Sequence, residues 1–141
     1  FERIPRVQTF VDAVLEECRD KGYVKTIFGR RREIQGVRSS SKRGDSRQRN
    51  LPERIAINTV IQGSAADLIK HAMIRVDEHL RRSDLEARML LQIHDELVFE
   101  SPVDQIPELS GMVTEEMIAC HELSVPLSVD VKSGPNWAEC E

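Results

Sequence analysis

The residues best suited to chemistry form a short acidic turn, Ile93-His94-Asp95-Glu96-Leu97, between two apolar segments. Tight connections between strands normally use Gly or Asn, which reach positive φ easily, so charged residues in this turn are unusual. A carboxylate held between two strands is well placed to bind a hard cation such as Mg²⁺, which favours one or two carboxylates together with substrate phosphate oxygens. The same residues are also compatible with a turn that is simply solvated.

A second group of polar residues, Arg54, Asn58 and Gln62, recurs at four-residue spacing within a segment with helical character. Such a row has a length of about 12 Å at a rise of about 1.5 Å per residue. It could follow about three or four base steps along a nucleic-acid groove. Continued along the helix, the row leads into the apolar residues Ile69 and Val76, so we expect it on the inward side, lining a cleft or hydrogen-bonded to neighbours.

Small residues, Gly63 to Ala66, follow this row directly. They would allow close approach either of another protein backbone or of a nucleic acid, and the sequence alone does not decide between the two.

Positive charge is concentrated in the first third of the chain. Residues 1–50 contain 13 Lys and Arg against 7 Asp and Glu, whereas residues 101–141 contain 1 against 8. Most of the excess lies between Arg30 and Arg49, which suits a polyanionic partner. A solvated basic loop without a partner would have the same composition.

Periodicity predicts the elements that must position these residues. We expect helices at Pro5–Lys21, Pro52–Arg82 and Val103–His121, a hairpin formed by Tyr23–Phe28 and Arg30–Ile34, strands at Ala87–Ile93, Leu97–Glu100 and Leu127–Val131, and a loop at Gln35–Asn50. Pro5 suits the first turn of the first helix and Gly22 its C-terminal end, while Asn50 or a neighbour opens the long helix. The predicted class is mixed α/β (α+β), with an antiparallel sheet that carries the His-Asp-Glu turn and is covered by the long helix and the Val103–His121 helix.

Composition excludes several classes of protein. A hydrophobic fraction of 40% and a charged fraction of 31% are typical of a globular domain, and the apolar runs are far too short to span a bilayer. Cys18, Cys120 and Cys140 form no CxxC pair, which argues against a disulfide framework or a structural zinc site and favours a reducing compartment. The chain begins at Phe1 without a targeting leader, which suggests a piece of a larger protein.

Several motifs, in order, resemble those of family A DNA polymerases, the bacterial DNA polymerase I type. Residues 92–100 (QIHDELVFE) resemble motif C, residues 53–58 and 62–70 the long helix of the palm, residues 26–32 the hairpin before it, and residues 134–137 the C-terminal end. The resemblance implies that residues 51–141 are part of the palm subdomain and that residues 1–50 derive from the fingers, within one structural unit.

The resemblance also implies the reaction and the residues that perform it. A deoxynucleotide is added to a primer 3′ end by two-metal nucleotidyl transfer, with release of pyrophosphate. Asp95 would bind Mg²⁺, with Glu96 beside it and His94 near the primer terminus. The primer–template would be bound by Arg54, Asn58, Gln62, Arg30 and Arg31. Gln62 and Arg54 would donate to minor-groove acceptors that are shared by all correct base pairs. The basic loop and Arg30 to Arg32 would lie near template or backbone phosphates.

This sequence departs from the family pattern in two respects. The motif A aspartate and the motif B lysine have no counterpart, so the isolated chain should bind Mg²⁺ weakly or not at all and should not polymerise. The basic stretch 35–50 is also longer than usual. We expect a monomer with DNA and deoxynucleoside triphosphates as partners, no membrane partner, and a cytoplasmic, nucleoid-associated location in a bacterium. The alternatives are a non-catalytic DNA-binding module and a nuclease, which would require Asp67 or Asp130 to join Asp95.

Overall fold

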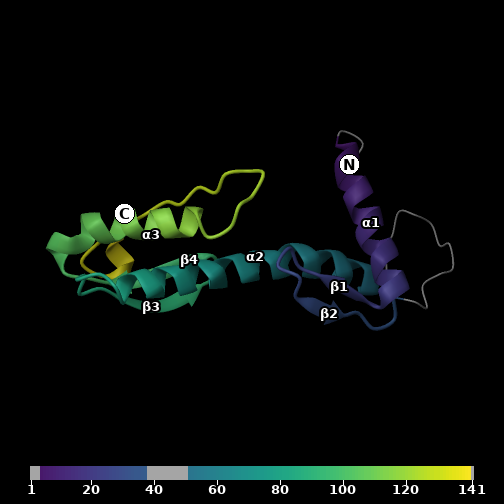
Figure 1. Cartoon of the computed structure of the whole chain (residues 1–141), viewed down its shortest axis with the longest axis horizontal. Helices are drawn as coiled ribbons and strands as arrows, with labels where there is room; N and C mark the ends of the chain where they lie inside the picture. Colours follow the sequence, from purple (N-terminus) through teal and green to yellow (C-terminus); the bar gives the residue numbers. More distant parts are fainter. Residues whose placement is uncertain (1–3, 38–50, 141) are drawn as a thin grey trace. The chain divides into compact units, whose positions relative to one another are not determined.

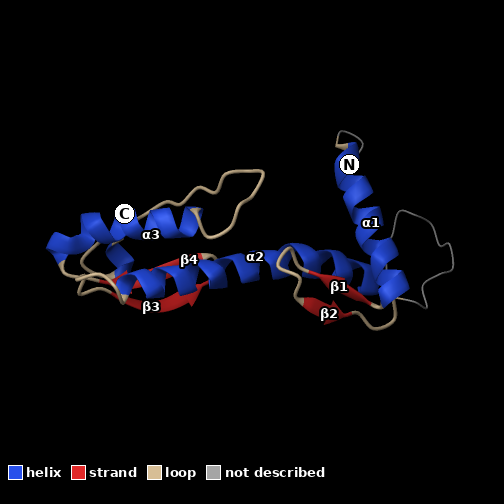
Figure 2. Cartoon of the chain, viewed as in Figure 1, coloured by secondary structure: helices blue, strands red, loops and turns tan. Residues whose placement is uncertain are grey.

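A computed structural model describes residues 4–37 and 51–140. The chain forms two compact units, Phe1–Asp67 and Leu68–Glu141, and each has its own antiparallel two-stranded sheet (Figure 1, Figure 2). The elements are α1 (Pro5–Lys21), β1 (Tyr23–Lys25), β2 (Arg31–Glu33), α2 (Leu51–Leu80), β3 (Arg88–Ile93), β4 (Glu96–Glu100) and α3 (Ile106–Ile118), with 3-10 turns at Val103–Gln105 and Trp137–Glu139. The predicted mixture of helices and antiparallel strands is therefore confirmed. The boundary between the units lies within α2.

The first unit is built around α1. This helix begins with Pro5, whose fixed φ suits the first turn, and ends at Gly22, which adopts the left-handed conformation with φ 79° and donates its N–H to the Cys18 carbonyl over 2.8 Å. Its apolar face buries Val11, Leu15 and Cys18 against residues of the hairpin and of the first half of α2, among them Val24 and Ala56. The hairpin and the first half of α2 thus share one core with α1.

The second unit combines the end of α2, the β3–β4 hairpin and α3. Val76 is fully buried, and it packs in one cluster with Leu109 and Met112 of α3. Met89 and Phe99, which pair directly across the two strands, pack against the same cluster. One face of the hairpin is therefore covered by helices, as the sequence predicts, while Leu90 and Leu91 remain exposed.

Two predicted elements differ from the structure. Leu127–Val131 forms no strand, because a strand requires a neighbour for its backbone N–H and C=O groups and, within the described residues, β3 and β4 pair only with each other. The predicted helix from Val103 is divided into a 3-10 turn and α3, which begins only at Ile106 with Pro107 in its first turn and is closed by Ala119. The loop 38–50 and the expected cap at Asn50 lie outside the described residues.

No helix within residues 4–37 and 51–140 combines the length and the apolar character needed to cross a membrane. The thiols of Cys18, Cys120 and Cys140 are free, and burial raises the pKa values of Cys18 and Cys120.

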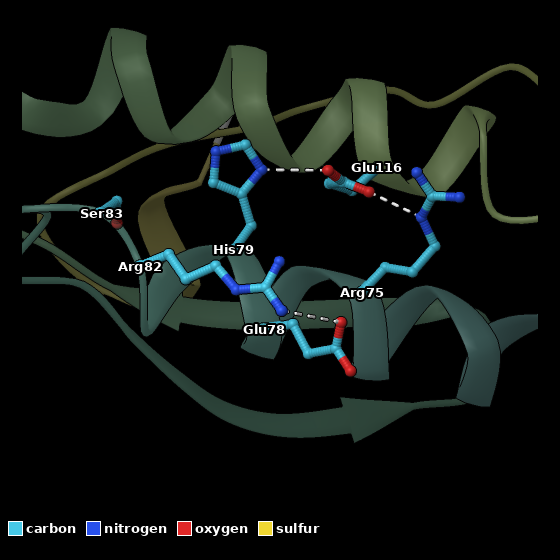
Figure 3. A pocket seen from close by; sticks show the side chains of 6 residues that line it. All are labelled: Arg75, Glu78, His79, Arg82, Ser83 and Glu116. Carbon is cyan, nitrogen blue, oxygen red and sulfur yellow. Dashed lines mark hydrogen bonds and ion pairs between the residues drawn. The ribbon is translucent and has the colours of Figure 1, made fainter.

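Polar contacts join α2 to α3 within the second unit (Figure 3). The Arg75 guanidinium donates from Nε to Glu116 over 2.7 Å and from Nη1 to the Ala119 carbonyl, at the end of α3, over 2.9 Å. His79 Nδ1 lies 3.0 Å from the other oxygen of the Glu116 carboxylate. These groups border a hollow of about 450 Å³ lined by Arg75, Glu78, His79, Arg82, Ser83 and Glu116. None of the residues predicted to act on a substrate lies in it.

The Glu116 carboxylate should make the stability of the second unit depend on acid pH. Hydrogen bonds from His79 and Arg75 lower the pKa of Glu116 from its ordinary value of 4.5. The pKa of Glu116 is lower in the folded chain than in the unfolded chain, so at acid pH the unfolded chain binds more protons. The stabilisation of the fold by the Glu116 carboxylate is therefore present above about pH 4.5 and is lost as the pH falls through the folded pKa. Urea unfolding followed by circular dichroism should show this loss. The measurements should run from about pH 3 to about pH 7, which brackets the ordinary Glu pKa of about 4.3.

Glu116→Gln should remove this part of the pH dependence, and Glu115→Gln, a change at an exposed neighbour, is the matched control. An identical pH profile for wild type and Glu116→Gln would contradict the assignment.

Candidate functional site

The acidic turn occupies the tip of the β3–β4 hairpin. Gln92 pairs with Leu97 and Ile93 with Glu96, so His94 and Asp95 alone form the two-residue connection. His94 has φ 52° and is the only non-glycine residue with positive φ in the described part of the chain. In a two-residue turn, a positive φ at the first central residue (His94) but not at the second (Asp95) is typical of a type II′ turn, in which Gly usually occupies the first position. A non-glycine residue there costs about 1–3 kcal/mol, and such strain concentrates at functional sites.

The side chains of this turn face solvent. His94, Asp95 and Glu96 are all exposed, and the turn is braced by Gln92, whose Nε2 donates to the His94 carbonyl over 2.7 Å. Glu96 is the first residue of β4 and is fixed in the strand pair, whereas Asp95 lies at the tip. The hairpin therefore presents the Asp95 carboxylate on a short connection between paired strands.

A complete metal site is not present in residues 4–37 and 51–140. No group of three or more His, Cys, Asp or Glu side chains there could hold a metal ion. Asp67 is buried and bound to Arg30, and Asp130 is exposed on a segment without secondary structure. The cluster required by the nuclease reading is thus not found in this part of the chain. Asp95 alone fits Mg²⁺, which uses one or two protein carboxylates and takes its other ligands from water and phosphate.

The polar row on α2 is exposed, so the prediction that it faces inward was wrong. Arg54, Asn58 and Gln62 all lie on the solvent side of the first half of α2, which buries Ala56 and Ile57 instead. Ile69 and Val76 are buried as expected. The extrapolation failed because α2 buries different faces in its two halves, and periodicity cannot reveal where that change occurs.

Arg30 is bound to α2 by two of its nitrogen atoms. Its Nε donates to Asp67 Oδ1 over 2.7 Å and its Nη2 to the Gly63 carbonyl over 3.2 Å. Half of the Arg30 side chain remains exposed, so a nucleic-acid contact is compatible with this pairing. Asp67 is buried, with 7% of its surface exposed. The sequence suggests it only as a possible metal ligand, whereas in the structure it forms this ion pair with Arg30.

At Gly63, the first of the small residues of α2, the helix is approached closely by the β1–β2 connection. A Cβ atom at this position would lie 3.0 Å from Thr26 Cγ2 and 3.4 Å from Arg30 Nη2, so glycine allows the β1–β2 connection to approach the helix. Ser64 Oγ accepts a hydrogen bond from the Ile27 N–H over 3.0 Å. Of the two uses left open by the sequence, the structure supports close approach of another protein backbone.

Arg31 and Arg32 leave β2 in opposite directions, since successive strand residues point to opposite faces. Arg32 reaches Thr59 of α2, with 3.3 Å between its Nη1 and the Thr59 hydroxyl. Arg31 lies over the Tyr23 ring, with 5.0 Å between its Cζ and the ring centroid. The basic residues after position 37 lie outside the described residues.

Comparison with known proteins identifies the family of this chain. The family model described as DNA polymerase family A matches residues 1–139, so this chain belongs to that family. It is 43% identical over 141 residues to DNA polymerase I of Streptococcus pneumoniae strain TIGR4 and to that of Geobacillus stearothermophilus, and in both cases the match spans all of this chain and 16% of the relative. DNA polymerase I of Chloroflexus aurantiacus is 44% identical over 140 residues, which cover 99% of this chain and 14% of the relative.

A solved structure agrees with these matches. The POL domain of Pol1 from M. smegmatis, in complex with DNA primer-template and dNTP, superposes with a TM-score of 0.87 and 42% identity over 97% of this chain and 24% of that chain. The chain therefore corresponds to about a sixth of the curated relatives and about a quarter of the polymerase domain.

The strain at His94 predicts an unusual order of stability among variants. His94→Gly should leave the urea midpoint unchanged or raise it, because glycine adopts positive φ without steric cost. His94→Val should lower the free energy of unfolding by about 1–2 kcal/mol, because β-branched residues are strongly disfavoured there. Equal stability of the Gly and Val variants would show that the turn does not hold residue 94 at positive φ.

Proposed function

We propose that this chain is the C-terminal portion of the polymerase domain of a bacterial DNA polymerase, comprising much of the palm and part of the fingers. The complete enzyme would join the primer 3′ oxygen to the α-phosphorus of a deoxynucleoside triphosphate while pyrophosphate leaves. The observation that carries the proposal is an exposed aspartate at the tip of a strained two-residue turn in a chain of this family.

Asp95 is the proposed metal ligand. Its carboxylate is exposed and is held between two paired strands, and His94 and Glu96 flank it in supporting positions. Bound Mg²⁺ supplies charge stabilisation to the reacting phosphate and lowers the pKa of the attacking hydroxyl. Further protein ligands would come from elsewhere in the polymerase, since the described residues assemble no group of three or more acidic, His or Cys side chains that could hold a metal. We infer that the chain on its own does not turn over.

Arg54, Asn58 and Gln62 are the proposed primer–template contacts. Their exposure on one face of α2 supports this role, because a row with a length of about 12 Å presents its side-chain donors to solvent, where a groove could reach them. Arg54 and Gln62 are suited to minor-groove acceptors, which recur in every correct base pair and therefore report pair geometry rather than sequence. Arg31 and the exposed part of Arg30 are the proposed phosphate contacts, which hold the duplex without reading it.

The proposed partners are primer–template DNA and deoxynucleoside triphosphates. The structural relative with a TM-score of 0.87 is a complex with DNA primer-template and dNTP, which supports this inference. We propose that the complete polymerase acts as a monomer on DNA in the bacterial cytoplasm, at the nucleoid and without a membrane partner.

Replacing Asp95 should separate catalysis from DNA binding. In a complete polymerase carrying this segment, Asp95→Ala should lower the single-turnover incorporation rate about a thousandfold or more, since several kcal/mol of charge stabilisation are lost. Primer–template affinity, measured by fluorescence anisotropy, should change little. Mn²⁺ binding followed by electron paramagnetic resonance should weaken in parallel. Asp104→Ala, which removes another exposed acid of the second unit, is the control, and near-normal incorporation by Asp95→Ala would refute the metal-ligand assignment.

Replacing Gln62 should affect accuracy more than speed. Gln62→Ala should reduce the preference for extending a matched over a mismatched primer terminus by roughly fivefold to tenfold, because one net hydrogen bond contributes about 1 kcal/mol. Single-nucleotide extension from both termini measures this ratio. Ile61→Ala alters the adjacent exposed side chain and should leave it unchanged. Identical ratios for wild type and Gln62→Ala would mean that Gln62 does not sense the terminal pair.

A further inference from the structure

The outer face of the β1–β2 hairpin carries two cations above one aromatic ring. Tyr23 and Lys25 of β1 and Arg31 of β2 share this face, because Lys25 pairs directly with Arg31 and strand residues alternate in direction. Arg31 Cζ lies 5.0 Å and Lys25 Nζ 5.9 Å from the centroid of the Tyr23 ring. Neither cation makes an ion pair with a residue in 4–37 or 51–140. The two like charges are thus held together on the tyrosine ring, which attracts both.

The inner side of the same hairpin is fastened to α2. Arg30 binds Asp67 and the Gly63 carbonyl, and the Ile27 N–H binds Ser64 Oγ, so the connection between the strands is attached to the helix at both of its ends. The connection is also closed internally, since the Thr26 N–H donates to the Arg30 carbonyl over 3.0 Å and the Arg30 N–H to the Thr26 hydroxyl over 3.2 Å. The attachment therefore fixes the backbone at residue 30.

Arg31 is the next residue, and its direction follows from that backbone. With the Arg30 guanidinium held by a buried carboxylate, the start of β2 has one position relative to α2, and the Arg31 side chain leaves it towards the Tyr23 ring. Without Asp67, the Arg30 guanidinium would lose its charged partner and the start of β2 would no longer be fixed. The ion pair behind the hairpin thus controls the placement of the Arg31 cation in front of it.

We propose that Asp67 is a positioning residue for nucleic-acid binding, acting through Arg30 to place Arg31 against the phosphate backbone, beside Lys25. The partner chemistry follows from the patch, because two adjacent cations that make no ion pair within residues 4–37 and 51–140 match closely spaced phosphates, and the Arg31 guanidinium can donate to two oxygens of one phosphate. Asp67 itself touches no nucleic acid. The inference rests on the proposed DNA-binding function and adds Lys25 and Asp67 to it.

A mutant cycle in a complete polymerase carrying this segment tests the coupling. Primer–template affinity is measured by fluorescence anisotropy across a range of salt concentrations for Arg31→Ala, Asp67→Asn and the double variant. Arg31→Ala should weaken binding about tenfold at low salt and reduce the slope of log affinity against log salt by about 0.9, the value for one phosphate contact. Asp67→Asn should weaken binding severalfold, and the double variant should bind no worse than Arg31→Ala. Asp77→Asn, which breaks an exposed Asp–Arg pair on the same helix, should leave affinity unchanged.

A second pair of variants guards against a simple folding defect in Asp67→Asn. Gly63→Ala keeps every charge and favours the helix, but its Cβ would press on Thr26 Cγ2 at 3.0 Å and displace the connection. It should weaken DNA binding like Asp67→Asn. Adding Thr26→Ser removes that methyl group and retains the hydroxyl that accepts from Arg30, so the double variant should regain affinity.

Each outcome has a distinct meaning. Additive losses from Asp67→Asn and Arg31→Ala, unchanged binding by Asp67→Asn, or no recovery on adding Thr26→Ser would overturn the positioning role while leaving the DNA contact of Arg31 intact. Unchanged binding by Arg31→Ala would instead remove the hairpin from the proposed DNA-binding function and the positioning role with it. The roles of Asp95 and Gln62 would be unaffected.

Discussion

The burial requirement of one long helix governs the rest of the structure. The 30 residues of α2 form a rod of about 45 Å, and each part of it must bury apolar residues against some other element. Its first half packs Ala56 and Ile57 with α1 and the β1–β2 hairpin, and its second half packs Val76 with α3 and the β3–β4 hairpin. The two halves of α2 bury different residues, and the Arg54, Asn58 and Gln62 row on the first half stays exposed.

Charged residues divide into those that hold the fold together and those that are left free for chemistry. Each of three shielded carboxylates, Glu53, Asp67 and Glu116, is paired with an arginine from another element. Because a charge away from water is costly unless it is paired, these contacts fix how the helices and the first hairpin pack. Asp95 and Glu96, by contrast, are exposed on a hairpin whose backbone is already paired. The fold therefore does not depend on the carboxylates of Asp95 and Glu96.

The sequence predicted the elements that depend on local chemistry. Pro5 and Gly22 mark the ends of α1, Gly29 with φ 80° marks the first hairpin, and the charged turn at His94 and Asp95 marks the second. Features that depend on distant partners were not predictable. Arg30 and Asp67 are 37 residues apart, so their ion pair leaves no periodic signal. Leu127–Val131 has the composition of a strand but no partner strand in the described part of the chain, and composition alone cannot supply one.

We propose that this chain carries one essential part of a polymerase site that other segments complete. The most direct measurement is a primer-extension assay with Mg²⁺ and all four deoxynucleoside triphosphates, run on this chain alone and on the chain joined to the preceding polymerase segment of a relative such as that of Geobacillus stearothermophilus. We expect extension by the joined protein and none by the chain alone. Extension by the chain alone would contradict the incomplete metal site, and extension by neither would favour a DNA-binding module without catalysis.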